Sequence, residues 1–221
     1  MINIAIDGPA GSGKSTLAKN IAKEFNILYL DTGAMYRTIA LAMKQNNIDV
    51  NNEKLVVEHL NKVNLEIKYI NSAQHVFLDG VDVSKDIRAN EISMLASTVS
   101  KIKLVRKKLV EMQRKIASQN DCVLDGRDIG TYVLPSAALK IFLIATPEVR
   151  AKRRKEELAQ NGIEVEYDDL LNEIKARDLQ DSTRSFAPLK KADDAIEIDT
   201  SNNTIEDTFK QAVNLASKFF K

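Results

Sequence analysis

The chain has 221 residues, 44% of them hydrophobic and 29% charged, with a formal net charge of +1 at pH 7. This length suits one substantial core, and the near-zero net charge gives no reason to expect nucleic acid or a membrane surface as a partner. The single cysteine, Cys122, excludes an intramolecular disulfide, and no apolar stretch reaches the roughly 20 residues that span a bilayer. Because the N-terminus also lacks a charged and then apolar leader, we expect a cytoplasmic protein.

The first motif follows an apolar run, Ile2 to Ile6, that predicts a β-strand. The residues after Asp7 match G-x-x-x-x-G-K-[ST], the phosphate-binding P-loop. Backbone N–H groups of such a loop surround phosphates, its lysine reaches the β- and γ-phosphates, and the next hydroxyl can ligate Mg²⁺. The apolar spacing after the loop is helical, so a helix N-terminus also faces the phosphates. We therefore predict that a nucleoside triphosphate binds at Gly8, Pro9, Ala10, Gly11, Ser12, Gly13, Lys14, Ser15 and Thr16, with Ser15 on the metal.

A second predicted strand, residues 27–30, follows the first helix and precedes another helix that runs from Asp31 to about Lys44. Strand, helix and strand in this order predict a parallel sheet. From Glu53 to about Ser100 the pattern changes, because residues 65–70 alternate with period 2, residues 71–72 suit a turn, and residues 75–80 return as a strand. We interpret this hairpin as a small insertion on an α/β core.

The second half of the chain returns to alternating helices and strands. Helical spacing predicts one helix over 91–119, strands over 121–125 and 139–145, and a helix from Pro147 to about 160. A helix over about 166–179, a strand over 195–199 and a final helix over 204–220 complete the pattern. The order predicts an α/β fold with a parallel sheet flanked by helices. The basic residues between 101 and 115 are best explained as a solvated helix face, apart from Arg106.

Seven arginines lie close to the ends of core elements: Arg37, Arg106, Arg127, Arg153, Arg154, Arg177 and Arg184. Taken singly, each suits a surface charge. As a set beside one P-loop they favour a kinase whose acceptor is itself a phosphate, since planar guanidiniums clamp phosphates and neutralise the transferring group. Residues 61–64 lack the aspartate of a guanine-reading N-K-x-D motif, which disfavours a GTPase switch. Asp125, at the end of an apolar strand, is either an acid that holds Mg²⁺ through water or a turn residue.

Four stretches together resemble bacterial cytidylate kinases: Gly8–Thr16, Asp31–Arg37, Asp125–Thr131, and residues 187–195 followed by Ile198–Thr200. The resemblance covers nearly the whole chain. It implies a P-loop nucleoside-monophosphate-kinase fold that transfers the γ-phosphate of ATP to CMP or dCMP with Mg²⁺. It also implies a core of about 1–35, 91–147 and 183–221, a monophosphate-binding region with the insertion at about 36–90, and a lid at about 148–182. We expect a monomer that binds no nucleic acid.

The resemblance implies that Asp128 and Arg106 read the cytosine base, assisted by the hydroxyl of Ser97. The chemistry agrees, because a carboxylate accepts from the 4-amino group and a guanidinium donates to O2 and N3. The carbonyl at position 4 of uracil would instead face the carboxylate of Asp128. From the residues alone, Asp128 could also be a structural aspartate that caps the turn after the strand.

The other implied roles concern the phosphates and the sugar. Arg37 and Arg127 would hold the acceptor phosphate, and Arg184 would reach the phosphates on closure. Tyr36, Arg177 and Asp181 match positions around the sugar, Thr32 matches a hydroxyl residue near the acceptor, and Arg153 and Arg154 match the lid over the donor phosphates. The expected catalytic set is Lys14, Arg37, Arg127, Arg153, Arg154 and Arg184.

Two alternatives stay open from the sequence. The same fold could phosphorylate another acceptor, such as UMP, AMP or a small metabolite like shikimate. A chain with the basic helix at 101–115 could instead be a non-catalytic nucleotide sensor or an RNA-associated P-loop protein.

Overall fold

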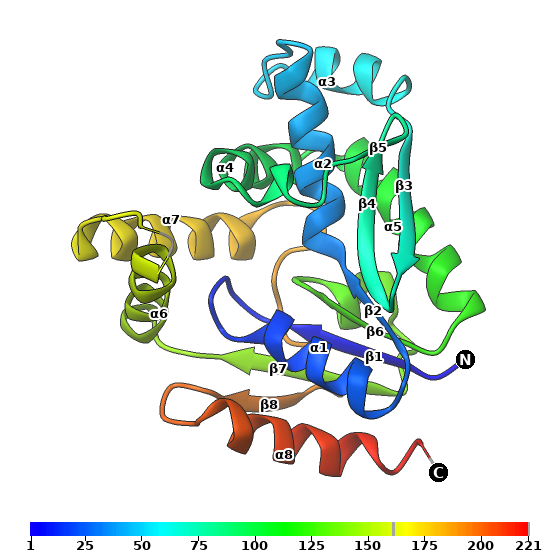
Figure 1. The fold of residues 1–221 in the computed structure, drawn as a ribbon, viewed down its shortest axis with the longest axis vertical. Coiled ribbons are helices and arrows are strands. Elements are labelled where there is room, and N and C mark those ends of the chain that lie inside the picture. The colour runs from blue at the N-terminus through cyan, green and yellow to red at the C-terminus, as the bar shows by residue number, and fades with distance from the viewer. Residues whose placement is uncertain (161, 221) are drawn as a thin grey trace. The chain divides into compact units, whose positions relative to one another are not determined.

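The computed structural model describes residues 1–160 and 162–220, and the chain divides into two compact units (Figure 1). Unit 1 comprises Met1–Ile27 and Asn120–Lys221 and carries the P-loop, and unit 2 comprises Leu28–Gln119 and carries the hairpin. The boundaries of the core, insertion and lid expected from the sequence differ from the boundaries of these two units, and that division stays a prediction.

Unit 1 contains a parallel sheet in which the strands follow the order β6-β1-β7-β8. Their bounds are Asn3–Asp7 for β1, Cys122–Gly126 for β6, Leu139–Ile144 for β7 and Ile196–Asp199 for β8. Strand β1 pairs with β6 on one side and β7 on the other, and Ile4, Ala5 and Ile6 are fully buried. A parallel strand covered on both faces has a near-continuous apolar sequence, which is why the run Ile2–Ile6 predicted it.

The helices of unit 1 form two groups (Figure 1). Helices α1 (Lys14–Glu24) and α8 (Ile205–Ala216) pack side by side against the sheet. Helices α6 (Pro147–Gln160) and α7 (Tyr167–Thr183) pack on each other around Ala151, Leu158, Leu170 and Ile174. Within the described residues, no helix is long and apolar enough to cross a membrane. The predicted parallel sheet flanked by helices is confirmed.

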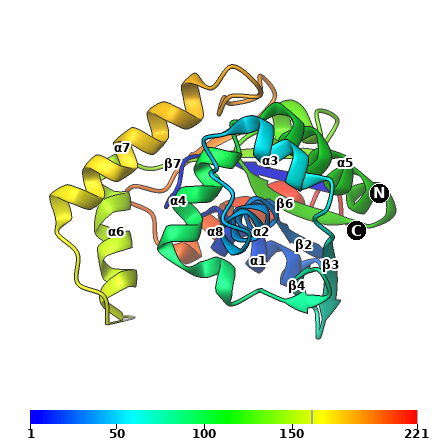
Figure 2. The same ribbon diagram turned by 90° about the horizontal axis from the view of Figure 1, so that it is seen from above.

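Unit 2 is built on the long helix α2 (Thr32–Gln45), which follows strand β2 (Leu28–Asp31) directly. Helix α3 (Glu53–Leu60), the 3₁₀ helix Asp86–Arg88, and helices α4 (Asn90–Val99) and α5 (Lys103–Gln119) complete its helical part, which Figure 2 shows from above. The predicted hairpin is confirmed as β3 (Leu65–Ile70) and β4 (Ala73–Leu78), extended by the short strand β5 (Val81–Asp82). Asn71 and Ser72 form its turn at positive φ, 50° and 61°.

The prediction of one continuous helix over 91–119 was wrong. The chain leaves the helix after Val99 and starts a new one at Lys103. At the break the Ser100 hydroxyl bonds back to the Ser97 carbonyl oxygen at 2.8 Å, and tight three-residue backbone bonds run from Lys101 to Thr98 and from Ile102 to Val99. Ile102 turns into the core, with 6% of its surface exposed, so apolar burial stabilises the interruption.

Candidate active site

The P-loop turns sharply from β1 into α1. Gly8 has a φ of +146°, and a Cβ at this position would lie 2.1 Å from the carbonyl oxygen of Leu143, so only glycine fits. The carbonyl oxygen of Pro9 accepts hydrogen bonds from the Ser12 hydroxyl at 3.0 Å and from the Lys14 ammonium at 2.5 Å. The loop therefore closes around the Lys14 side chain, as a phosphate-binding loop requires.

Lys14 is electrostatically frustrated in this position. It is buried, and burial together with the nearby Arg127 guanidinium lowers its pKa well below the usual range, while Asp125 and Asp7 act in the opposite direction. A bound anion such as a triphosphate would favour the charged form and offset the cost of burying it.

Ser15 and Asp125 meet next to the loop, where the Ser15 hydroxyl donates to the Asp125 carboxylate at 2.6 Å. A hydroxyl and a carboxylate are hard oxygen ligands of the type that Mg²⁺ takes, and Mg²⁺ usually fills its remaining positions with water and substrate phosphates. The described residues contain no cluster of three or more His, Cys, Asp or Glu side chains that could hold a metal alone. The pair fits a Mg²⁺ ion that arrives with a nucleotide.

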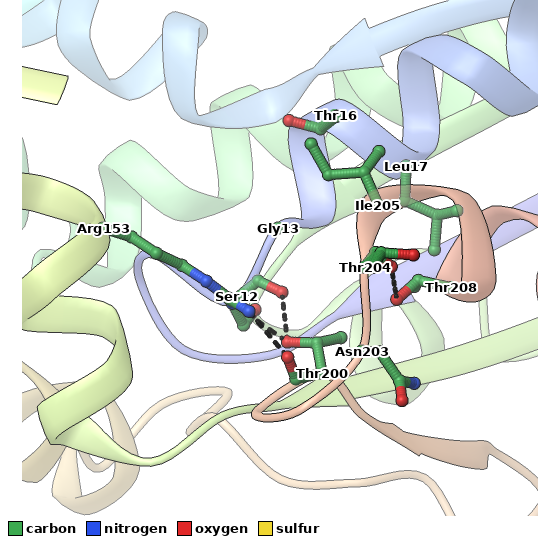
Figure 3. A pocket seen from close by; sticks show the side chains of 10 residues that line it. All are labelled: Ser12, Gly13, Thr16, Leu17, Arg153, Thr200, Asn203, Thr204, Ile205 and Thr208. Atoms are coloured by element: carbon green, nitrogen blue, oxygen red, sulfur yellow. Dashed lines mark hydrogen bonds between the residues drawn. The ribbon is translucent and has the colours of Figure 1, made fainter. Parts of the chain in front are cut away.

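A cavity of about 350 Å³ opens beside the P-loop within unit 1 (Figure 3). Ser12, Gly13, Thr16 and Leu17 form one wall, Arg153 of α6 lies at another, and the chain between β8 and α8 supplies Thr200, Asn203, Thr204, Ile205 and Thr208. The Arg153 guanidinium donates to the Thr200 carbonyl at 2.6 Å and to its hydroxyl at 3.2 Å, and that hydroxyl lies 3.1 Å from the Ser12 carbonyl oxygen. Thr200 thus joins the P-loop to Arg153 of α6.

The two arginines expected in the lid differ in whether they line the cavity. Arg153 lines the cavity, whereas Arg154 pairs with Glu157 of its own helix at 2.9 Å and is not among the lining residues. Sequence reasoning quoted Thr200 within a motif but gave it no role, and it missed Asn203 and Thr204, which carry no motif of their own.

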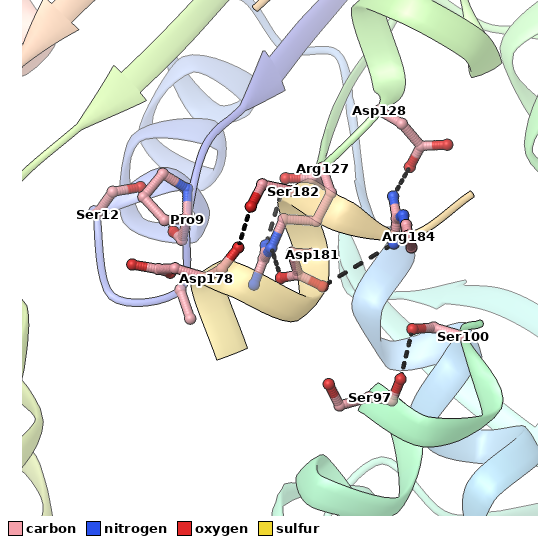
Figure 4. A network of polar contacts seen from close by, with 12 residues as sticks. Pro9, Ser12, Ser97, Ser100, Arg127, Asp128, Asp178, Asp181, Ser182 and Arg184 are labelled. Carbon is pink, nitrogen blue, oxygen red and sulfur yellow. Dashed lines mark hydrogen bonds and ion pairs between the residues drawn. The ribbon is translucent and has the colours of Figure 1, made fainter. Parts of the chain in front are cut away.

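Unit 1 also brings together four of the predicted acceptor residues, Arg127, Asp128, Asp181 and Arg184, in a network of alternating charges (Figure 4). Arg127 Nε donates to Asp181 at 2.9 Å, and Arg184 lies 3.4 Å from Asp128 and 4.0 Å from Asp181. Burial alone would raise the pKa of Asp181, but the guanidiniums of Arg127, Arg177 and Arg184 outweigh it and lower that pKa. Asp181 therefore stays ionised and holds the arginines in place.

Arg150 is a further arginine of this unit that the sequence did not single out. It is 2% exposed, forms two bonds to the Asp178 carboxylate at 3.0 and 2.5 Å, and donates to the carbonyl oxygens of Ala145 and Ala10. It joins α6, α7 and the P-loop through one side chain.

In unit 2, Asp31 gathers two arginines. Its carboxylate caps α2 by accepting from the Ala34 N–H at 2.8 Å, and one of its oxygens lies 2.8 Å from Arg37 and 3.2 Å from Arg88. Burial would raise the pKa of Asp31, but Arg37 and Arg88 outweigh it and lower the pKa. Among the described residues, the buried Nε of Arg37 has no hydrogen-bond partner. Arg88 was missed by the sequence reasoning, because its short 3₁₀ helix matches no motif.

The predicted base-reading residues of unit 2 lie near the break between α4 and α5. Arg106 is 1% exposed, donates to the Ser100 carbonyl at 3.2 Å, and its guanidinium carbon lies 5.3 Å from the centroid of the Tyr36 ring. Ser97 stands at the same break, and Thr32 is the buried first residue of α2. The structure thus brings Arg106 and Tyr36 together, with Ser97 adjoining the same turn.

The sequence of the whole chain matches a known family. A family model described as cytidylate kinase matches residues 4–218. The chain belongs to the cytidylate kinase family. It is 53% identical over 220 residues to the cytidylate kinase of Caldicellulosiruptor bescii, covering 100% of this chain and 97% of that protein. It is 50% identical over 217 residues to the cytidylate kinase of Fusobacterium nucleatum, covering 98% and 96%. The resemblance seen in the motifs is confirmed.

A solved structure supports the fold. An uncharacterized protein from Eubacterium ventriosum superposes on this cytidylate kinase family member with a TM-score of 0.51, at 17% identity, covering 98% of this chain and 99% of that one. At this identity the likeness concerns the fold alone.

Proposed function

We propose that this member of the cytidylate kinase family transfers the γ-phosphate of ATP to CMP or dCMP, giving ADP and CDP or dCDP. The observation that carries the proposal is the presence, in one compact unit, of a P-loop with a buried lysine and the charged network of Arg127, Asp128, Asp181 and Arg184. Family membership supports both the reaction class and the acceptor. We further propose a monomer that acts in pyrimidine nucleotide metabolism and binds no nucleic acid.

The donor would bind at the P-loop. The N–H groups of the loop and Lys14 would surround its phosphates, and the nucleoside would enter the cavity next to Leu17 and Thr204. Ser15 and Asp125 would hold Mg²⁺, which when bound offsets phosphate charge. Arg153 would approach the donor from α6.

The acceptor would be recognised by the residues that the resemblance assigns. Asp128 would accept from the cytosine amino group and Arg106 would donate to O2 and N3, with Ser97 assisting. Tyr36, Arg177 and Asp181 would surround the sugar, Thr32 would lie near the acceptor, and Arg37, Arg127 and Arg184 would hold its phosphate. The partnerless Nε of Arg37 supports its part, since a guanidinium with a spare donor can take an oxyanion.

Catalysis in this scheme needs no covalent intermediate and no strong general base. The acceptor phosphate is already ionised near neutral pH, because its second pKa is about 6. Lys14 and the arginines would align an acceptor oxygen with the γ-phosphorus and stabilise charge on the transferring group. Closure of the lid would exclude the water that hydrolyses ATP.

The test is a panel of acceptors, namely CMP, dCMP, UMP and AMP, each with ATP and a readout of ADP formation. We expect CMP and dCMP to have the highest kcat/KM, and a higher value for UMP or AMP would overturn the base assignment. Replacing Arg127 with Ala should lower kcat by about a thousandfold while ATP binding persists, by analogy with other phosphate-clamping arginines. Replacing Arg114, an exposed arginine of α5, provides the matched control. ATP binding without ADP formation, with salt-sensitive RNA affinity, would favour the non-catalytic alternative.

A further inference from the structure

Asp7 is a buried acid that the proposed mechanism does not use. It is the last residue of β1, immediately before Gly8, and only 4% of its surface is exposed. One of its carboxylate oxygens accepts the Ile129 N–H at 2.8 Å and the other accepts the Gly130 N–H at 2.7 Å. All of these residues belong to unit 1.

The two N–H groups that donate to Asp7 belong to the first two residues of an unusual helix. Residues Ile129–Val133 form a single-turn π-helix, with the Val133 N–H bonded to the Asp128 carbonyl at 3.0 Å and the Leu134 N–H to the Ile129 carbonyl at 2.7 Å. Single π-turns are frequent at functional sites. The first amides of any helix need acceptors from outside the helix, and here Asp7 supplies them for Ile129 and Gly130.

This arrangement bears on the two roles considered for Asp128, base reader or local cap. Within the described part of the chain, the Asp128 side chain makes no hydrogen bond that caps the π-helix, although Asp128 holds the capping position. Its carboxylate instead lies 3.4 Å from the Arg184 guanidinium. The capping of this helix is therefore done from β1 by Asp7 and not by Asp128.

The start of the π-helix is also closely packed on the side that faces Lys140. A Cβ at Gly130 would lie 3.1 Å from Cδ of Lys140 and 3.4 Å from a carboxylate oxygen of Asp7. Lys140 is itself fixed, since its ammonium donates to the Pro135 carbonyl at 2.6 Å and to both oxygens of Asp194 at 2.8 Å. The start of the π-helix therefore lies between the Asp7 carboxylate and the stem of Lys140.

Keeping an acid at this position is costly. Burial and, to a smaller extent, Asp128 raise the pKa of Asp7, whereas the two amides and Lys14 lower it, and the resulting pKa is about 6. A neutral side chain would avoid this cost but could not offer two acceptor oxygens to two N–H groups.

We propose that Asp7 is a positioning residue for acceptor recognition, which fixes the start of the π-helix and thereby aims the side chains of Arg127 and Asp128. The inference rests on the proposed function, because it concerns how that reaction selects its acceptor. Asp7 touches no substrate in this scheme and acts through the backbone of Ile129 and Gly130.

The test is the Asp7→Asn variant of the full chain. The amide has nearly the same shape, but its NH₂ group would confront one of the two N–H groups, so one charge-assisted bond is lost. We expect the KM for CMP to rise about tenfold or more, as the loss of such a bond would give, and the ratio of kcat/KM for CMP over UMP to fall. The KM for ATP should rise by less than the KM for CMP, because the variant keeps the bonds that close the P-loop and changes only the charge that faces Lys14.

The matched control is Asp121→Asn. Asp121 accepts the Ile2 N–H at 2.6 Å, so it makes the same kind of carboxylate–amide bond at the opposite ends of the same two strands, β1 and β6. This variant should lower Tm without changing the KM for CMP or the preference over UMP. A general loss of stability is thereby separated from a loss of positioning.

The outcomes are distinguishable. If the wild-type chain does not prefer CMP to UMP, the proposed function fails. If it does, and Asp7→Asn leaves the KM for CMP unchanged or raises the KM for ATP equally, the positioning role of Asp7 is wrong. Should Asp7→Asn not fold, Gly130→Ala displaces the start of the π-helix from the other side, and an unchanged KM for CMP in that variant also overturns the inference.

Discussion

Arg150 and Asp178 form a two-point ion pair, with their nitrogen and oxygen atoms 3.0 and 2.5 Å apart, that joins helix α6 to helix α7. The Arg150 side chain is almost completely buried, and it also donates to the P-loop carbonyl of Ala10 at 3.2 Å. One side chain therefore links helices α6 and α7 to the P-loop.

Replacing Arg150 with Met should lower the free energy of unfolding by about 3 kcal/mol, since removal of one partner from a buried pair leaves the other uncompensated. Urea unfolding followed by circular dichroism measures the loss. Lys175→Ala is the control, because Lys175 and Glu148 bridge the same two helices at 3.8 Å but are more than half exposed. Such an exposed pair should contribute less than about 1 kcal/mol, and equal effects of the two variants would contradict the assignment.

Loss of the Thr200 hydroxyl should weaken binding of ATP but not binding of CMP. Thr200→Val keeps the shape of the side chain but removes the hydroxyl bond to the Ser12 carbonyl and one of the two bonds from Arg153. We expect the KM for ATP to rise about fivefold, consistent with a net loss of about 1 kcal/mol from these hydrogen bonds, while the KM for CMP is unchanged. Arg153→Ala and Arg154→Ala in the same assay compare the two lid arginines, and a larger effect of Arg154 would contradict the role of the cavity.

Asp181 should make the protein sensitive to acid. Its pKa is lowered in the folded state, so its contribution to stability is present at neutral pH, above the unfolded pKa of about 4, and is lost as the pH falls through the folded value. Asp181→Asn should therefore be less stable at pH 7 and lose less stability on acidification. Urea midpoints between pH 7 and pH 3 measure this, and the exposed Asp193→Asn should leave the wild-type curve unchanged.

Cys122 should be inert in the folded protein. Its side chain is fully buried on β6, and burial raises the pKa of the thiol to about 12, with Asp121 adding to the effect. Because the thiolate is the reactive form, an aromatic disulfide reagent at pH 8 should release its chromophore only after urea is added. Rapid release without denaturant would show that β6 opens or that the thiol is accessible.

Much of unit 1 could be predicted because its signals are local. The P-loop follows from a short motif, and the apolar run before it marks a strand that is buried on both faces. The hairpin of unit 2 likewise follows from period-2 alternation around two turn residues. These features depend on neighbours in the sequence, so they are visible without the structure.

The features that could not be predicted depend on residues distant in sequence. The bonds from Asp7 to Ile129 and Gly130 span more than a hundred residues, and nothing near either end indicates them. The break at Ser100 depends on burial of Ile102, which helical spacing alone does not distinguish from a continuous apolar stripe. Arg88 shares a carboxylate with Arg37 only because the fold brings its short helix to the N-terminus of α2.

The pairing of guanidiniums with carboxylates affects which anions the arginines attract. Arg127, Arg37 and Arg150 each lie beside a carboxylate, within one compact unit in every case. Bare arginines in such numbers would repel one another and attract any dense phosphate chain, with little regard to its shape. Because carboxylates already balance their charge, these guanidiniums favour an anion whose oxygens match the planar, two-donor geometry of each group. In the proposed scheme this pairing favours a small nucleotide by geometry, while the net charge of the chain stays at +1.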